Sequence, residues 1–186
     1  YRFLRFCRCD RACRAGRTWG TCRTCRICRT SRSGPRQYPS RPRGDRVADQ
    51  ADEADAPVAT GWGVPIRWSG DVGDIPAGYT GTLRRAVELY EVGEEPDTFV
   101  ICGGVVHPGR RKGSGLADAL IVGLCQLADT APWPRVIAPL RPTLKHLYPL
   151  AGIDDYAAWS RDDGAPFDPW LRTHVRLGGR VISTAP

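Results

Sequence analysis

The chain has 186 residues, 41% of them hydrophobic, which suits one ordinary domain with a packed core. No window holds the roughly eighteen uncharged apolar residues that a membrane helix needs. No apolar run follows the arginine-rich start, as it would in a secretory signal peptide. We therefore expect a cytoplasmic protein without a membrane partner.

The net charge of +7 is distributed unevenly along the chain. Up to Arg46 there are fourteen arginines against Asp10 and Asp45, a balance of +12, whereas the remainder has a balance of −5. Six of the eight cysteines also fall in this first part, between Cys7 and Cys28. The basic excess is thus confined to the first quarter, and the remainder gives no reason to expect a nucleic-acid partner.

Residues 1–57 form an arginine- and cysteine-rich segment followed by a linker. Aliphatic residues are nearly absent after Leu4, so burial cannot offset the chain entropy that folding would cost. Three interpretations compete. The first is a zinc or iron–sulfur site on Cys22, Cys25 and Cys28 together with Cys7, Cys9 and Cys13. The second is a basic arm for nucleic acid, and the third is GC-rich DNA read in the wrong frame. The cysteines lack the two separated pairs of a zinc ribbon. We favour the third interpretation, in which the segment is disordered or not native.

Residues 58–186 have the composition of a folded domain. The β-branched and aromatic residues of Val58–Trp68 predict a strand, in which Pro65 must lie at an edge or a bulge. After a turn-rich stretch, the spacing of apolar residues in Thr82–Val92 predicts a short amphipathic helix. Its inward face is predicted to carry Leu83, Val87 and Tyr90.

A strand–helix–strand unit follows. The continuous apolar run Thr98–Val106 predicts a central strand covered on both faces. Apolar residues at helical spacing predict a helix over Leu116–Asp129, and Arg135–Leu140 is predicted to be another short strand. This order predicts an α/β fold with a mixed sheet.

The glycine-rich turn His107–Gly115 joins the predicted central strand to the helix. Gly113 and Gly115 let the backbone approach a ligand closely, and the first amides of a helix lie at the positive end of its dipole. Such a turn can bind phosphate or diphosphate. Lys112 precedes Gly113, which is the wrong order for a Walker A loop. Asp118 stands where a Rossmann fingerprint has its third glycine or alanine.

The remaining pattern, Arg-x-x-Gly-x-Gly at Arg110, Gly113 and Gly115, resembles the Gln/Arg-x-x-Gly-x-Gly/Ala signature of the GCN5-related N-acetyltransferases (GNAT). It stands in the same place, after the fourth strand and at the start of a helix. The resemblance extends over residues 58–186 through the strings VIAPLRPTLKHLYPL, DYAAWSRDDG and PFDPWLRTHVRLGG. The family's first strand, first helices and last strands have no counterpart. The resemblance therefore implies an incomplete GNAT-like mixed sheet flanked by helices.

The resemblance implies an acyl-CoA-dependent N-acyltransferase, which transfers acetyl from acetyl-CoA to an amine by direct attack on the thioester. In the family the acyl donor lies where the fourth and fifth strands splay apart. The backbone of Val105 and Val106 is therefore expected to pair with the pantetheine arm. The other expected cofactor-binding residues surround the diphosphate: Arg110, Arg111, Lys112, Gly113, Ser114 and Gly115. The sequence specifies neither the acceptor amine nor the oligomeric state.

The resemblance also implies a proton donor for the leaving thiolate, which in the family is often a tyrosine before a Leu-Gly-Phe-like turn. Here the turn is Leu177–Gly179 and the matching position is His174, with Tyr148, nearer the fifth strand, as a second candidate. Each has a simpler interpretation, Tyr148 as a packing tyrosine and His174 as a helix-surface or supporting histidine. Asp168, which precedes Pro169, is predicted to cap a helix.

Two interpretations from other classes stay open. A non-catalytic acyl-CoA-binding module would keep the glycine-rich turn and lack the acid and the base. A cysteine-rich metal or nucleic-acid binder would be centred on Cys7–Cys28. For the acyltransferase we predict acetyl-CoA as acyl donor, a small-molecule or peptide amine as acceptor, and neither a metal nor nucleic acid.

Overall fold

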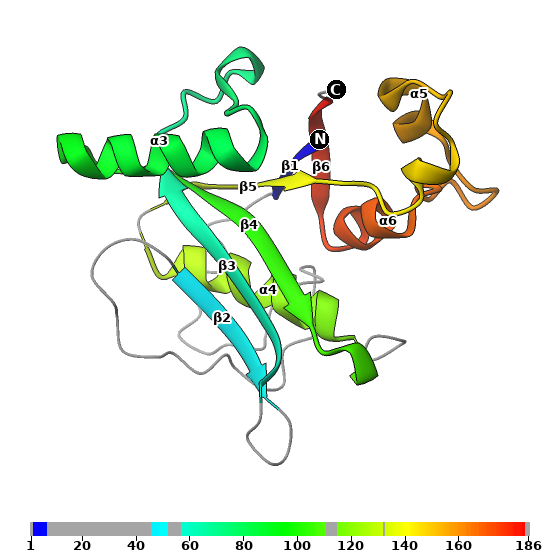
Figure 1. Cartoon of the computed structure of the whole chain (residues 1–186), viewed down its shortest axis with the longest axis horizontal. Helices are drawn as coiled ribbons and strands as arrows, with labels where there is room; N and C mark the ends of the chain where they lie inside the picture. Colours follow the sequence, from blue (N-terminus) through cyan, green and yellow to red (C-terminus); the bar gives the residue numbers. More distant parts are fainter. Residues whose placement is uncertain (1, 7–45, 52–56, 111–114, 132, 185–186) are drawn as a thin grey trace, which may run out of the picture.

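The computed structural model describes residues 2–6, 46–51, 57–110, 115–131 and 133–184 (Figure 1). Its frame is a six-stranded sheet in the order β2-β3-β4-β5-β1-β6. The neighbours β4 and β5 are parallel and all other neighbouring strands are antiparallel, so the sheet is mixed, as predicted. The strands are β1 Arg2–Phe6, β2 Arg46–Ala51, β3 Pro57–Ile66, β4 Thr98–Val106, β5 Arg135–Leu140 and β6 Gly179–Thr184.

Helices cover both faces of the sheet (Figure 1). Helix α3 packs on one face, and α4 packs on the other, against β2, β3 and β4. None of the helices in the described part of the chain is long and apolar enough to cross a membrane. The helices are α3 Gly78–Val92, α4 Leu116–Asp129, α5 Ile153–Ala158 and α6 Pro169–Arg176, with 3-10 turns η1 Val72–Asp74, η2 Pro108–Arg110 and η3 Lys145–Leu147.

The two central strands divide their side chains between two cores. Successive strand residues point to opposite faces, so Phe99 and Ile101 of β4 join the cluster that contains Leu124 of α4. The residue between them, Val100, packs with Ile137 of β5 in the cluster on the α3 side. This alternation places α4 against one face of β4.

Strand β3 combines a bulged register with an edge proline. Its pairing with β2 ends at Gly63, so Pro65 is paired only with β4 and costs no hydrogen bond to β2. The register with β4 shifts between Trp62 and Gly63. The sequence prediction that Pro65 lies at an edge or bulge is therefore confirmed.

The inward face of α3 differs from the predicted one. The sequence predicts Leu83, Val87 and Tyr90 as the buried stripe. Val87 and Tyr90 are 56% and 66% exposed, whereas Thr82 is fully buried. The Thr82 hydroxyl donates to the carbonyl oxygen of Gly78 over 2.8 Å, which satisfies the polar group inside the helix. A threonine therefore takes an inward position that periodicity assigns to an apolar residue.

Two strands lie in the segment for which the sequence predicts no structure. β1 is inserted between β5 and β6 and is antiparallel to both, and β2 pairs with β3. A strand can take its hydrogen bonds from neighbouring strands, so these residues pair without a core of their own. The rest of the segment, including Cys7–Cys28, lies outside the described residues.

Candidate functional site

The ladder between β4 and β5 opens after three residue pairs. Only Thr98–Val100 pairs with Arg135–Ile137, although β4 continues to Val106. At this point Ile101 is opposite Gly63 and Gly103 is opposite Trp62, so Cys102 is an extra residue in β4. A bulge of this kind bends a strand and increases its twist. It accounts for the separation of the two strands.

The second half of β4 is correspondingly less buried. Its first four residues are buried, but Gly104 and Val105 are exposed, and Val105 retains 52% of its accessible surface. The sequence prediction of cover on both faces is therefore wrong for this half. Val105 and Val106 pair with Thr60 and Ala59 of β3, and the β5 ladder does not reach them.

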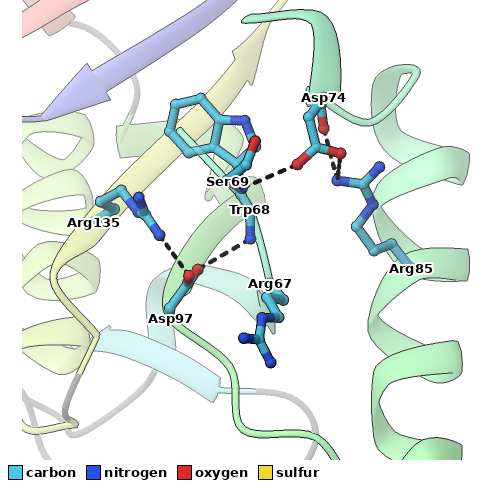
Figure 2. Close-up of a pocket in the computed structure, with 7 residues that line it drawn as sticks. All are labelled: Arg67, Trp68, Ser69, Asp74, Arg85, Asp97 and Arg135. Carbon is cyan, nitrogen blue, oxygen red and sulfur yellow. Dashed lines mark hydrogen bonds and ion pairs between the residues drawn. The ribbon is translucent and has the colours of Figure 1, made fainter. Parts of the chain in front are cut away.

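The closed end of the β4–β5 pair is held by polar contacts around Asp97. Its carboxylate accepts hydrogen bonds from the backbone amide of Trp68 (3.0 Å), the hydroxyl of Thr98 (2.7 Å) and the guanidinium of Arg135. The Arg135 guanidinium also lies 5.6 Å from the centroid of the Trp68 ring. These contacts join the end of β3 to the starts of β4 and β5 (Figure 2).

An open hollow of about 520 Å³ lies over this end of the sheet (Figure 2). Its charged side chains are paired with one another or with neighbours: Arg85 lies 3.0 Å from Asp74, and Arg67 lies 3.0 Å from Glu94. It is at the opposite end of β4 from Val106. We interpret the hollow as a by-product of the ion pairs that hold the strands.

Helix α4 begins beside the open end. Its N-cap, Gly115, has the left-handed φ of 69°, a conformation that favours glycine, and a glycine has no side chain of its own with which to cap the helix. A Cβ on Gly104 would lie 2.7 Å from Leu120 of α4, so this glycine permits the close approach of helix and strand. Of the predicted diphosphate-binding residues, Gly115 is described, the Arg110 side chain is not, and residues 111–114 lie outside the described ranges.

Asp118, in the first turn of α4, has a partner that the sequence does not reveal. Arg176, at the end of α6, donates two hydrogen bonds to its carboxylate, over 2.7 and 2.8 Å. The ion pair joins the start of one helix to the end of another across fifty-eight positions of sequence. No local pattern could have predicted it.

His174, two residues before Arg176 in α6, is buried. It is 1% exposed, and its Nδ1 lies 2.9 Å from the carbonyl oxygen of Trp170. Because a carbonyl only accepts hydrogen bonds, the proton of the neutral ring is on Nδ1. Burial lowers the pKa of His174 to about 4. An uncharged, enclosed imidazole favours the supporting role over proton donation to a substrate.

Tyr148 belongs to a different group of contacts. Its ring packs edge-on against Trp159 and Phe167, with centroids 4.9 and 5.7 Å away, and also touches Tyr156. The structure does not place Tyr148 and His174 in one group, since His174 contacts Trp170. Packing against these aromatic rings accounts for the position of the Tyr148 side chain. Tyr148 as a whole is partly exposed.

Asp168 holds the C-terminal elements together. As predicted, it caps α6 and precedes a proline at the first turn, accepting from the amides of Trp170 (2.9 Å) and Leu171 (3.2 Å). It also accepts from the amide of Leu144 and the hydroxyl of Tyr156, both over 2.9 Å. Burial raises its pKa, but these hydrogen bonds outweigh burial and hold the pKa below its ordinary value.

A solved structure shares the fold. The chain superimposes on the loading GNATL domain of CurA from Lyngbya majuscula with a TM-score of 0.54 and 17% identity, over 71% of this chain and 62% of that one. The chain has the GNAT fold. The mixed, helix-flanked sheet that the GNAT resemblance implies is thereby confirmed.

The sequence is also similar to that of an N-acetyltransferase. It is 32% identical over 147 residues to arginine N-acetyltransferase avaD of Aspergillus versicolor, which covers 74% of this chain. The chain spans 50% of the length of that relative. No family model matches the sequence. Among the described residues, no group of three or more His, Cys, Asp or Glu side chains could hold a metal ion.

Proposed function

We propose that the chain is part of an acyl-CoA-dependent N-acyltransferase of the GNAT class. The observation that carries the proposal is the junction of two features: the β4–β5 ladder opens after Val100, and α4 begins beside the open end with a glycine, Gly115, as its N-cap. An opened ladder offers backbone groups to an extended ligand, and a helix N-terminus favours an anion. Acyl-CoA has both parts.

In this proposal the chain binds the donor mainly through its backbone. The second half of β4, at Val105 and Val106, would pair with the pantetheine arm. The amides from Arg111 to Gly115 would surround the diphosphate, and Arg110 and Lys112 would add positive charge. Residues 58–186 would hold these functions, and β1 and β2 would complete the sheet.

The reaction would be direct transfer. The amine nitrogen attacks the thioester carbonyl, the amine loses a proton, and the thiolate of the donor leaves and takes up a proton. Of the two predicted acids, Tyr148 is the one we propose to test, because its ring is partly exposed whereas His174 is enclosed. His174 would instead support the end of α6.

For the acceptor, the name of the similar Aspergillus protein suggests free arginine as the first amine to test. The assay would follow release of the CoA thiol from acetyl-CoA, with and without arginine, lysine and a primary-amine peptide. We expect thiol release that depends on the acceptor and an acetylated amine detectable by mass spectrometry. CoA binding without turnover on any amine would favour the non-catalytic binding module instead.

A further inference from the structure

The ion pair between α4 and α6 has a consequence for anion binding. Asp118 stands in the first turn of α4, three residues after Gly115, and the proposed function assigns the amide of Gly115 to a diphosphate. A carboxylate there stabilises the helix dipole but repels a bound anion. Cancelling that charge would remove the repulsion.

We infer that Arg176 is a positioning residue for the acyl donor, which neutralises Asp118 beside the diphosphate. The inference rests on the proposed function. One guanidinium nitrogen of Arg176, Nη2, lies 2.7 and 2.8 Å from the two carboxylate oxygens of Asp118, distances that are typical of charge-assisted hydrogen bonds. The Asp118 side chain retains only 26% of its surface, so solvent screens its charge incompletely.

Arg176 supplies the positive charge beside the Asp118 carboxylate. The buried neighbour His174 is uncharged at neutral pH, because burial lowers its pKa to about 4. With Arg176 in place, the ion pair is neutral overall and the helix N-terminus keeps its affinity for an anion. Without Arg176, the negative charge of Asp118 would oppose the same ligand.

A structural alternative makes a different prediction. The ion pair also joins α4 to α6, so it could serve stability alone. Loss of either partner would then weaken ligand binding in the same direction, and loss of both would not restore it. Charge cancellation predicts opposite effects for the two partners, and this difference separates the hypotheses.

The experiment measures CoA binding by calorimetry for the wild type, Arg176→Gln, Asp118→Asn and the double variant. We expect Arg176→Gln to weaken binding about two- to fivefold, the size of a charge effect at a helix terminus. Asp118→Asn should tighten binding by a similar factor, and the double variant should return near the wild-type affinity. Arg180→Gln, at an exposed arginine of β6, is the matched control and should bind as the wild type does.

Ligand variants identify the phosphate group involved. The effect of Arg176→Gln should persist with dephospho-CoA, which keeps the diphosphate, and disappear with pantetheine, which lacks it. An effect confined to CoA would assign the charge to the 3′-phosphate and contradict the inference as stated. In turnover, the KM for acetyl-CoA should rise while kcat is unchanged.

Two failures are distinguishable. If the folded wild type binds no CoA, both the proposed function and this inference are wrong. If the wild type binds CoA and the three variants lose affinity together, the ion pair is structural and only the inference is wrong. Thermal unfolding of each variant confirms that the comparison is made between folded proteins.

Discussion

Arg135, the first residue of β5, donates to the carboxylate of Asp97, which directly precedes β4, and so holds the two parallel strands at one end. The same arginine donates to the Thr98 hydroxyl over 3.1 Å. The strands are thus fixed where their ladder forms and diverge beyond the bulge at Cys102. The separation of β4 from β5 therefore results from both the fixed end and the bulge.

Replacement of Asp97 tests this anchor. Asp97→Ala removes the acceptor for Trp68, Thr98 and Arg135, of which the Arg135 side chain is only 20% exposed. We expect a loss of about 2–4 kcal/mol in the free energy of unfolding, because a partly buried guanidinium loses its carboxylate partner and two further donors lose their acceptor. Urea unfolding measures the change.

The matched control is Glu94→Ala. Glu94 pairs with Arg67 at 3.0 Å, but both side chains are more than half exposed. Surface ion pairs contribute about 0–1 kcal/mol, so this variant should unfold at nearly the wild-type urea concentration. Equal losses for the two variants would show that Asp97 is not an anchor.

Asp168 should be among the least replaceable residues of the C-terminal part. Asp168→Ala removes the cap of α6 and leaves buried donors on Leu144, Tyr156 and Leu171 without their acceptor. We expect a loss of about 3–5 kcal/mol, or failure to fold. Asp162→Ala, at an exposed position, should change stability by less than about 0.5 kcal/mol. A small effect at Asp168 would contradict the role of this contact.

Gly63 is required by the close pairing of β3 with β4. A Cβ there would lie 2.4 Å from the Phe99 ring and 2.5 Å from the carbonyl oxygen of Val100. Gly63→Ala should therefore destabilise the protein by about 1–3 kcal/mol. Gly81→Ala is the opposite case, because the nearest atom to its added Cβ is at 3.5 Å and the position is helical. It should stabilise the protein by about 0.5–1 kcal/mol, as thermal unfolding can show.

The buried His174 predicts a pH dependence of stability. Burial lowers its pKa from 6.5 to about 4 in the folded state, so between these values the unfolded chain binds more protons. Stability should fall as the pH falls through this window, by up to about 3 kcal/mol from this residue. Urea unfolding of wild type and His174→Asn at several pH values measures the slope. The slope should be smaller in the variant and unchanged in His146→Asn, at an exposed histidine.

The elements with strong local signals were predictable from the sequence. The bounds of β4, α4 and β5 agree with the predicted ranges Thr98–Val106, Leu116–Asp129 and Arg135–Leu140. Each combines an apolar pattern with a glycine or proline boundary, so that local and tertiary preferences agree. The cap at Asp168 was predictable for the same reason, since the Asp-Pro pair carries its own signal.

The parts that depend on distant partners were not predictable. Val87 and Tyr90 satisfy a helical pattern, but Thr82 takes the inward position because its hydroxyl finds a partner within the helix. The Asp118–Arg176 pair joins residues fifty-eight positions apart and has no sequence signature. For the site itself, the pattern identified Gly115 as the start of α4, whereas the burial of His174 depends on how α6 packs.

The most direct test of the account is CoA binding to Gly115→Val compared with Lys112→Ala, measured by calorimetry with the wild type alongside. A β-branched residue is strongly disfavoured at the φ of 69° that Gly115 adopts, and its side chain would crowd a diphosphate at the helix end. A cationic side chain near a helix terminus contributes about 0.3–1 kcal/mol. We therefore predict that Gly115→Val loses at least about tenfold in affinity and Lys112→Ala less than about fivefold. A folded Gly115→Val protein that binds CoA as tightly as the wild type would contradict the assignment of this helix end to the acyl donor.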